Sequence, residues 1–231
     1  CRAKTPTSDE ESFKQLRPWV KKKKAWAQRL MGDMYYHGKG VKQSYEMARR
    51  LFEQAAQQGY GNAMYNLGVM YEHGEGVEQS YKKAFEYYEQ AAHLGHASAQ
   101  FNLGILYANG RGVEQSYETA AELYEQAVQQ GDAGAMYNLG RLYFNGHGVE
   151  QSYEKAKEYC KQAADLGHAK GMYYLGVMYE HGQGVEQWYE KAFEYYEQAA
   201  HLGVAEAQYN LGHMYYNGQG VEKDIAQARV W

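Results

Sequence analysis

A repeat of 36 residues constrains the fold of this chain more than any other feature of the sequence. The dipeptide Leu-Gly returns at this step, as Leu67-Gly68, Leu103-Gly104, Leu139-Gly140, Leu175-Gly176 and Leu211-Gly212. A Gly-x-Gly-Val motif keeps the same step, starting at Gly38, Gly74, Gly110, Gly146, Gly182 and Gly218. Repeats of about 20 to 50 residues with helical patterning are typical of solenoids, in which each unit packs on its neighbours. The sequence therefore predicts an all-α fold, an α/α superhelical solenoid of two-helix repeats.

Each repeat is predicted to form two helices joined by a glycine turn. In the first helix, for example residues 63–73, apolar side chains and Gly68 share one face at helical spacing. A glycine inside a helix costs about 1 kcal/mol, so its return in every repeat indicates that another helix approaches closely there. Gly74 is expected to end this helix in a left-handed turn, and Ser80 to cap the second helix at residues 81–94.

Two positions depart from this pattern. Trp188 stands where other repeats have a capping serine or aspartate, so the helix that follows is expected to be frayed or held in another way. Cys160 stands at the core position that carries an aromatic residue in other repeats, and a buried cysteine there is structural by default.

The repeats also predict how the chain divides. Residues 1–8 are expected to be irregular, and residues 9–23 to form a degenerate helix that Pro18 interrupts. Residues 24–231 form the solenoid, with units near 24–59, 60–95, 96–131, 132–167, 168–203 and 204–231, the last of them truncated. A start at Cys1 and an incomplete last unit lead us to expect a fragment of a longer protein.

Charge and composition narrow the class of partner. Residues 1–30 hold nine basic and three acidic residues, whereas residues 31–231 hold fifteen basic and twenty-five acidic ones. An acidic solenoid lacks the clustered Lys and Arg that phosphate contacts need, so no nucleic-acid partner is expected. No apolar run reaches the length of about 20 residues that spans a bilayer. With only two cysteines, a reducing, cytoplasmic location is predicted.

The repeat pattern resembles a known family. Over residues 25–231 the motif Ala-x-x-x-Leu-Gly-x-x-Tyr-x-x-Gly-x-Gly-Val is followed by Ala-x-x-x-Tyr-x-x-Ala-Ala-x-x-Gly. This is similar to the Sel-1-like repeat (SLR) family, which is tetratricopeptide-like. The resemblance implies a superhelix whose first helices line the concave side, and a role as an adaptor for protein complexes. The chain lacks the cysteine pattern of the secreted bacterial members.

A second resemblance lies at the start of the chain. Cys1-Arg2-Ala3-Lys4-Thr5-Pro6 is similar to the closing edge of a RING-type zinc finger, in which Cys1 would be the last zinc ligand. This implies an alternative function: the chain would be the substrate-recruiting part of a ubiquitin ligase. The other interpretation is that Cys1 is incidental. One ligand alone cannot hold zinc, so no metal site is expected within this chain.

The tetratricopeptide-like arrangement implies which residues face a partner on the concave side. They flank each Leu-Gly pair, and the predicted partner-binding set is Tyr65, Asn66, Phe101, Asn102, Tyr137, Asn138, Arg141, Tyr173, Tyr209, Asn210 and His213. Asparagine can hold a peptide backbone because it both donates and accepts, and aromatic rings suit interface hot spots. The alternative is that these residues only pack between repeats. Tyr174 interrupts the row of asparagines.

The remaining candidate sites are weak. Arg29, Arg141 and Lys170 are too scattered to clamp a terminal carboxylate, and the nine histidines form no ligand set with Cys or carboxylates. No nucleophile–base pair is apparent, so this chain is not expected to be an enzyme or to bind a cofactor. The sequence predicts a non-catalytic scaffold that binds a protein or peptide.

Overall fold

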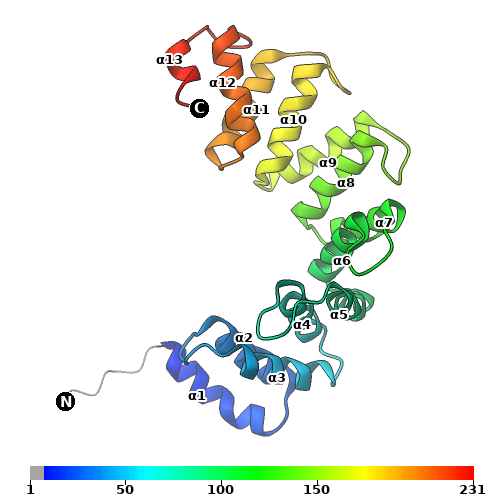
Figure 1. Cartoon of the computed structure of the whole chain (residues 1–231), viewed down its shortest axis with the longest axis vertical. Coiled ribbons are helices and arrows are strands. Elements are labelled where there is room, and N and C mark those ends of the chain that lie inside the picture. The colour runs from blue at the N-terminus through cyan, green and yellow to red at the C-terminus, as the bar shows by residue number, and fades with distance from the viewer. Residues whose placement is uncertain (1–7) are drawn as a thin grey trace, which may run out of the picture. The chain divides into compact units, whose positions relative to one another are not determined.

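The computed structural model describes residues 8–231, and over that range the chain contains helices and no β-strand (Figure 1). The helices are α1 (Ser8–Lys21), α2 (Ala25–His37), α3 (Tyr45–Ala56), α4 (Gly61–His73), α5 (Tyr81–His93), α6 (Ala97–Asn109), α7 (Tyr117–Val128), α8 (Ala133–Asn145), α9 (Tyr153–Asp165), α10 (Ala169–His181), α11 (Tyr189–His201), α12 (Ala205–Asn217) and α13 (Ile225–Ala228). The zinc-finger hypothesis at Cys1 and nearly all of the predicted irregular segment lie outside the described residues.

The described part of the chain forms two compact halves, one ending at Ser116 and the other running from Tyr117 to Trp231. Within each half, every helix packs against the next helix along the chain, α1 to α6 in the first half and α7 to α13 in the second. The even-numbered helices α2 to α12 are the first helices of the repeats, and the odd-numbered helices α3 to α13 are the second helices. This neighbour-to-neighbour packing confirms the predicted fold class. Among the helices of residues 8–231, none is both long and apolar enough to cross a bilayer.

The ends of the helices follow the predicted turn chemistry. Every first helix ends at the first glycine of Gly-x-Gly-Val, and Gly74 has a φ of 73°, in the left-handed region. The Ser80 side chain accepts a hydrogen bond of 3.3 Å from the backbone N–H of Lys83, which confirms the predicted cap of α5. Trp188 gives α11 no side-chain cap, but its backbone N–H donates to the Tyr179 carbonyl at 2.9 Å, as the Ser80 N–H donates to Tyr71 at 2.8 Å, and α11 begins at the same repeat position as α5.

The glycine of Leu-Gly makes room for an aromatic ring of the second helix. A Cβ atom added to Gly68 would lie 2.4 Å from the Tyr88 ring, and one added to Gly176 would lie 2.5 Å from the Tyr196 ring. Real Cβ atoms do not come this close to a ring, so the ring rests directly on the helix backbone. The close approach predicted from the recurring glycine is confirmed.

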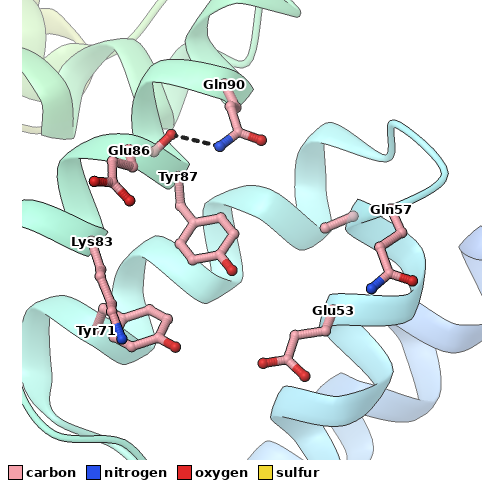
Figure 2. Close-up of a pocket in the computed structure, with 8 residues that line it drawn as sticks. Glu53, Gln57, Tyr71, Lys83, Glu86, Tyr87 and Gln90 are labelled. Atoms are coloured by element: carbon pink, nitrogen blue, oxygen red, sulfur yellow. Dashed lines mark hydrogen bonds between the residues drawn. The ribbon is translucent and has the colours of Figure 1, made fainter.

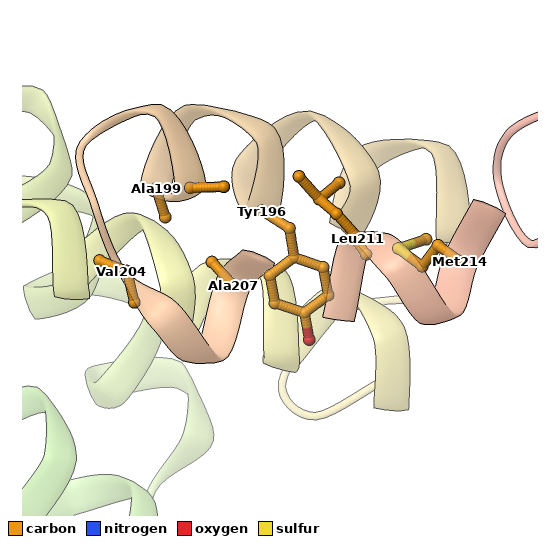
Figure 3. Close-up of a cluster of buried hydrophobic side chains, with 8 residues drawn as sticks. Tyr196, Ala199, Val204, Ala207, Leu211 and Met214 are labelled. Carbon is orange, nitrogen blue, oxygen red and sulfur yellow. The ribbon is translucent and has the colours of Figure 1, made fainter. Parts of the chain in front are cut away.

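The buried core is local to neighbouring helices, as the cluster around α11 and α12 illustrates (Figure 3). Tyr196 from α11 packs with Leu211 and Met214 from α12, and all three side chains are fully buried. Cys160 is fully buried as well, as its repeat position predicts.

One prediction about the N-terminal helix is wrong. Helix α1 does not break at Pro18 but continues to Lys21, and the Pro18 carbonyl accepts a hydrogen bond of 3.1 Å from the Lys22 N–H. Proline inside a helix costs about 3 kcal/mol. Burial of Phe13, whose ring meets Tyr35 edge-on at 5.4 Å, offsets this cost by anchoring α1 on the first repeat. Tertiary packing therefore overrides the local signal.

Candidate functional site

The predicted partner-binding residues lie on first helices in both halves, and we call the part of each half that carries them its first-helix surface. In the N-terminal half the Tyr65 ring stacks on His96, with centroids 4.7 Å apart and planes at 16°. In the C-terminal half Tyr137 stacks in the same way on His168, at 5.0 Å and 27°. Tyr209 is 74% exposed. The tyrosines of internal repeats therefore combine packing between repeats with partial exposure.

The two histidines under these rings are helix caps, a role that the sequence reasoning missed. Nδ1 of His96 accepts a hydrogen bond of 3.3 Å from the backbone N–H three residues further on, and Nδ1 of His168 does the same. Burial lowers the pKa of both imidazoles. Asp132 caps α8 from the equivalent repeat position, at 2.8 Å. The alignment of both histidines with an aspartate at a helix start was the signal that could have revealed them.

The asparagines of this surface are held by neighbouring repeats. Three of them bond to a buried tyrosine hydroxyl of the preceding second helix, and the pairs are Asn102–Tyr88, Asn138–Tyr124 and Asn210–Tyr196. The preceding second helix of Asn66 carries Phe52, which has no hydroxyl, and Asn66 Nδ2 instead donates to Asp33 at 2.8 Å. The amides are therefore fixed in orientation at the surface.

A hollow of about 240 Å³ lies on the first-helix surface of the N-terminal half; its lining residues are Asp33, Tyr36, His37, Phe52, Tyr65, Asn66 and Val69. It joins two predicted residues, Tyr65 and Asn66, to polar groups that the sequence reasoning missed. Arg29 pairs with Asp33 at 2.5 Å, while burial raises the pKa of the Asp33 carboxyl. The hydroxyl of Tyr36 donates to Glu75, and burial raises its pKa.

The first-helix surface of the C-terminal half gathers aromatic rings near Arg141. Tyr174 meets Tyr137 at a centroid distance of 5.5 Å and Tyr173 at 5.6 Å, both edge-on. Burial raises the pKa of Tyr137 to about 12, and the nearby charge of Arg141 opposes that rise. Tyr174, which in sequence only interrupts the asparagines, is thus at the centre of the cluster.

The last predicted residues lie on α12. Tyr209 and His213 line one hollow of about 480 Å³ together with Tyr216, Ile225 and Trp231. Tyr216 is 57% exposed, so apolar rings dominate this part of the surface. Asn210 is not part of that lining, and its amide bonds to the Tyr196 hydroxyl.

A different hollow, of about 550 Å³, lies between the second helices α3 and α5 (Figure 2). On one side the Tyr71 and Tyr87 rings stack at 5.6 Å and 10°, with Lys83 Nζ 5.0 Å from the Tyr71 centroid. Figure 2 shows Glu53 and Gln57 across the gap. The same arrangement of two stacked tyrosines and a lysine recurs in the C-terminal half, in the sets Tyr143–Tyr159–Lys155 and Tyr179–Tyr195–Lys191.

This recurrence explains the stacked tyrosines as packing between the two helices of a repeat. The repeats with Leu51 and Leu123 in place of the second tyrosine carry Met47 and Thr119 in place of the lysine. The lysine therefore accompanies the tyrosine pair throughout, and we assign this hollow no partner.

The chemistry available at these surfaces is that of binding. Burial raises the pKa of the Cys160 thiol to about 12, which keeps it protonated and unreactive at neutral pH. Within residues 8–231, no group of three or more His, Cys, Asp or Glu side chains is arranged to hold a metal ion. What the first-helix surfaces offer is ring faces, fixed amides, hydroxyls and the guanidinium of Arg141.

Comparison with known proteins matches the repeated sequence to one family model. The Sel1 repeat model matches the chain six times, at residues 27–60, 61–96, 97–132, 133–168, 169–204 and 205–231. No curated protein matches the chain.

Two solved structures are similar over nearly all of the chain. The protective antigen c5321, present in uropathogenic Escherichia coli strains and described as displaying an SLR fold, is 36% identical with a TM-score of 0.87. That match covers 94% of this chain and 47% of the antigen, so the chain spans about half of the antigen's length. A Sel1 repeat protein from Oxalobacter formigenes is 30% identical with a TM-score of 0.91, over 96% of this chain and 89% of that one.

Proposed function

Because the chain belongs to the Sel1 repeat family, we propose that it is a non-catalytic scaffold that binds a protein or peptide partner through its first-helix surfaces. Sel1 repeat proteins are generally protein-interaction scaffolds. The observation that carries the proposal is the hollow beside Tyr65 and Asn66, in which an aromatic ring and a fixed amide border the same space.

The contacts around this hollow support binding with little loss of side-chain freedom. The Tyr65 ring is held against His96, and the Asn66 amide is held by Asp33. Side chains that are ordered before binding lower the entropic cost of association, which runs to about 0.5–1.5 kcal/mol for each mobile side chain that a partner must immobilise. A surface prepared in this way suits a partner that supplies few contacts.

The polar groups around the hollow suit an extended peptide. Asp33, Tyr36 and Asn66 supply polar lining, and Phe52 and Val69 supply apolar lining. An apolar peptide side chain could enter the hollow while the backbone bonds to the amide and hydroxyl. The first-helix surface of the C-terminal half offers the same types of group at Tyr137 and Asn138.

Selection of random linear peptides displayed on phage would test this proposal. We expect the wild-type chain to enrich a set of peptides that the Tyr137→Ala, Asn138→Ala double variant and the Tyr65→Ala variant bind at least tenfold more weakly, as the loss of a contact of about 1.4 kcal/mol predicts. The control is Lys83→Ala with Glu86→Ala, which alters the hollow between α3 and α5 instead.

The result that would contradict the proposal is equal enrichment by the wild type and both surface variants, with circular dichroism showing that all are folded. Because Asn138 also bonds to Tyr124, the double variant could lose stability. The Tyr209→Ala variant then gives an independent test, since Tyr209 is 74% exposed and contributes little to packing.

A further inference from the structure

Three departures from the repeat pattern meet at one place in the C-terminal half. Arg141 occupies a position that holds Asp33, Val69, Ile105, Val177 or His213 in the other repeats, so it is the only basic side chain other than histidine there. Tyr174 stands where the other internal repeats have Asn66, Asn102 and Asn138, and Cys160 replaces the buried aromatic residue of the second helix. Because the repeats are otherwise similar, three changes at one place indicate a role that is specific to this part of the chain.

The geometry sets Arg141 beside an aromatic wall. Tyr137, Arg141 and Phe144 are spaced i, i+4 and i+7 along α8 and so lie on one face of that helix. The Tyr174 ring, from α10, meets both outer members edge-on, Tyr137 at 5.5 Å and Phe144 at 5.6 Å. Because Arg141 lies between those two residues on the helix, its side chain leaves α8 next to the Tyr174 ring.

Cys160 makes this wall possible. It is fully buried and packs with Leu175, and the Tyr174 ring packs against this pair. In other repeats the position of Cys160 holds a Tyr or Phe ring, and the position of Tyr174 holds an asparagine in all of them but the first, which has Leu30. The small cysteine thus leaves the space that the Tyr174 ring fills, and a polar amide is exchanged for an aromatic face beside the guanidinium.

Arg141 has no counter-charge in the described part of the chain. It is half-buried, and neither the ion pairs nor the cation–π contacts found among residues 8–231 include it. Arg29, on α2, is half-buried too, but it pairs with Asp33 at 2.5 Å. Glu206, an acidic residue whose charge affects Tyr137 and Tyr174, is exposed on α12 and makes no ion pair with Arg141.

The groups around Arg141 favour an anion. No nitrogen of Arg141 is among the buried side-chain atoms that lack a partner, so the guanidinium is open to an incoming anion, which would meet no competing counter-charge. Burial raises the pKa of Tyr137 to about 12 and raises that of Tyr174, so both hydroxyls remain protonated and able to donate at neutral pH. The charge of Arg141 lowers the pKa of both hydroxyls against the effect of burial, so the three groups are near one another, and all three can donate.

We propose that Arg141, with the hydroxyls of Tyr137 and Tyr174, receives the carboxylate of an Asp or Glu side chain of a partner peptide. This inference rests on the proposed function, since it names one subsite of the first-helix surface. A single guanidinium matches the two oxygens of one carboxylate, whereas clamps for a chain terminus or a doubly charged phosphate draw on several cations. Peptides with one acidic residue are therefore the expected ligands.

The test uses synthetic peptides selected by the wild-type chain, each made with Glu, Gln or phosphoserine at its acidic position. We expect Glu to Gln replacement to weaken binding on the order of tenfold, as the loss of a charge-assisted hydrogen bond predicts. In Arg141→Val, which copies Val69 and Val177, the difference between Glu and Gln peptides should disappear. In Arg141→Glu a peptide with Lys at that position should bind best.

Every other outcome contradicts either the subsite or the proposed function. Equal binding of Glu and Gln peptides to the wild type, or a preference for Glu that survives in Arg141→Val, would overturn the subsite and leave the peptide-binding function intact. Tighter binding of phosphoserine than of Glu peptides, lost in Arg141→Val, would replace the carboxylate by a phosphate. If the wild type selects no peptide at all, the proposed function fails together with the subsite. Circular dichroism of Arg141→Val checks that the variant is folded.

Discussion

At the scale of single residues, two histidines combine two tasks, helix capping and ring stacking, and the capping depends on their being neutral. His96 and His168 accept a backbone hydrogen bond at Nδ1 and lie flat under the rings of Tyr65 and Tyr137. A proton on Nδ1 would remove the acceptor and place positive charge at a helix N-terminus, where the helix dipole disfavours it. The order of the first-helix surface therefore depends on pH.

Because of these caps, the free energy of unfolding is expected to decrease as the pH is lowered. Burial lowers the pKa of both imidazoles below the ordinary value of 6.5, so the unfolded chain binds more protons than the folded one. Their contribution to the unfolding free energy is complete above pH 6.5 and is lost as the pH falls through the lower pKa of the folded state. Urea unfolding followed from about pH 7.5 to about pH 5 should show this loss.

The matched control is built into the chain, because Asp132 caps α8 from the same repeat position. In the double variant His96→Asp, His168→Asp the fall in stability over this pH range should be smaller than in the wild type. An equally steep fall in both proteins would mean that other groups carry the pH dependence.

A second residue-scale prediction concerns the pair Cys160 and Tyr174. Cys160→Tyr restores the usual aromatic residue but places it where the Tyr174 ring already packs, so it should destabilise the chain by about 1–3 kcal/mol. Adding Tyr174→Asn, which restores the usual partner, should recover most of that loss. A double-mutant cycle by urea unfolding measures the coupling, and strictly additive effects would contradict the exchange of space between the two side chains.

At the scale of elements, the glycine of Leu-Gly reverses an ordinary rule of helix stability. Replacing an exposed glycine inside a helix by alanine stabilises it by about 1 kcal/mol. Gly68→Ala should instead destabilise the chain, because the new Cβ would lie 2.4 Å from the Tyr88 ring. Thermal or urea unfolding measures the sign.

Gly212 provides the comparison for this prediction. It has the same repeat position, but the nearest side-chain atom to an added Cβ is Trp231 Cβ at 3.8 Å, with the Ala228 carbonyl oxygen at 3.3 Å. Gly212→Ala should therefore be much milder than Gly68→Ala. Similar losses in both variants would indicate that backbone conformation, and not the ring, decides the effect.

The same elements show how far the sequence could predict this molecule. The period, the glycine turns and the serine caps depend on local chemistry, so the two-helix repeats and their ends could be predicted. The continuation of α1 through Pro18 could not, because it depends on the burial of Phe13 against another helix. The histidine caps could have been found by aligning His96 with Asp132, since the capping chemistry is local.

The candidate site was predictable in its positions but not in its bonds. That Tyr65 and Asn66 lie at the surface followed from the repeat register, whereas the bond from Asn66 to Asp33 depends on Phe52 having no hydroxyl. Tyr174 seemed only to interrupt a row, because its environment comes from two other helices. Contacts between repeats, which no single repeat contains, carry the missing information.

At the scale of the whole molecule, packing between neighbours predicts that damage stays local. Leu211 is fully buried between α11 and α12, and Leu211→Ala should cost about 2–5 kcal/mol in that part of the C-terminal half. Amide hydrogen exchange followed by mass spectrometry should rise most in α11 and α12 and least in α7 and α8. A uniform rise through all these helices would show that the half unfolds as one cooperative block.

The closeness of Tyr137 and Tyr174 has a consequence for the kind of sequence that this surface could read. These rings belong to successive repeats, yet their centroids are only 5.5 Å apart. An extended peptide advances about 3.3 Å per residue, so groups recognised by adjacent repeats would fall within about two or three residues of each other. The partner would then carry a short linear motif, in which an acidic residue has an apolar residue as a near neighbour, and such a motif can occur in proteins that share no fold.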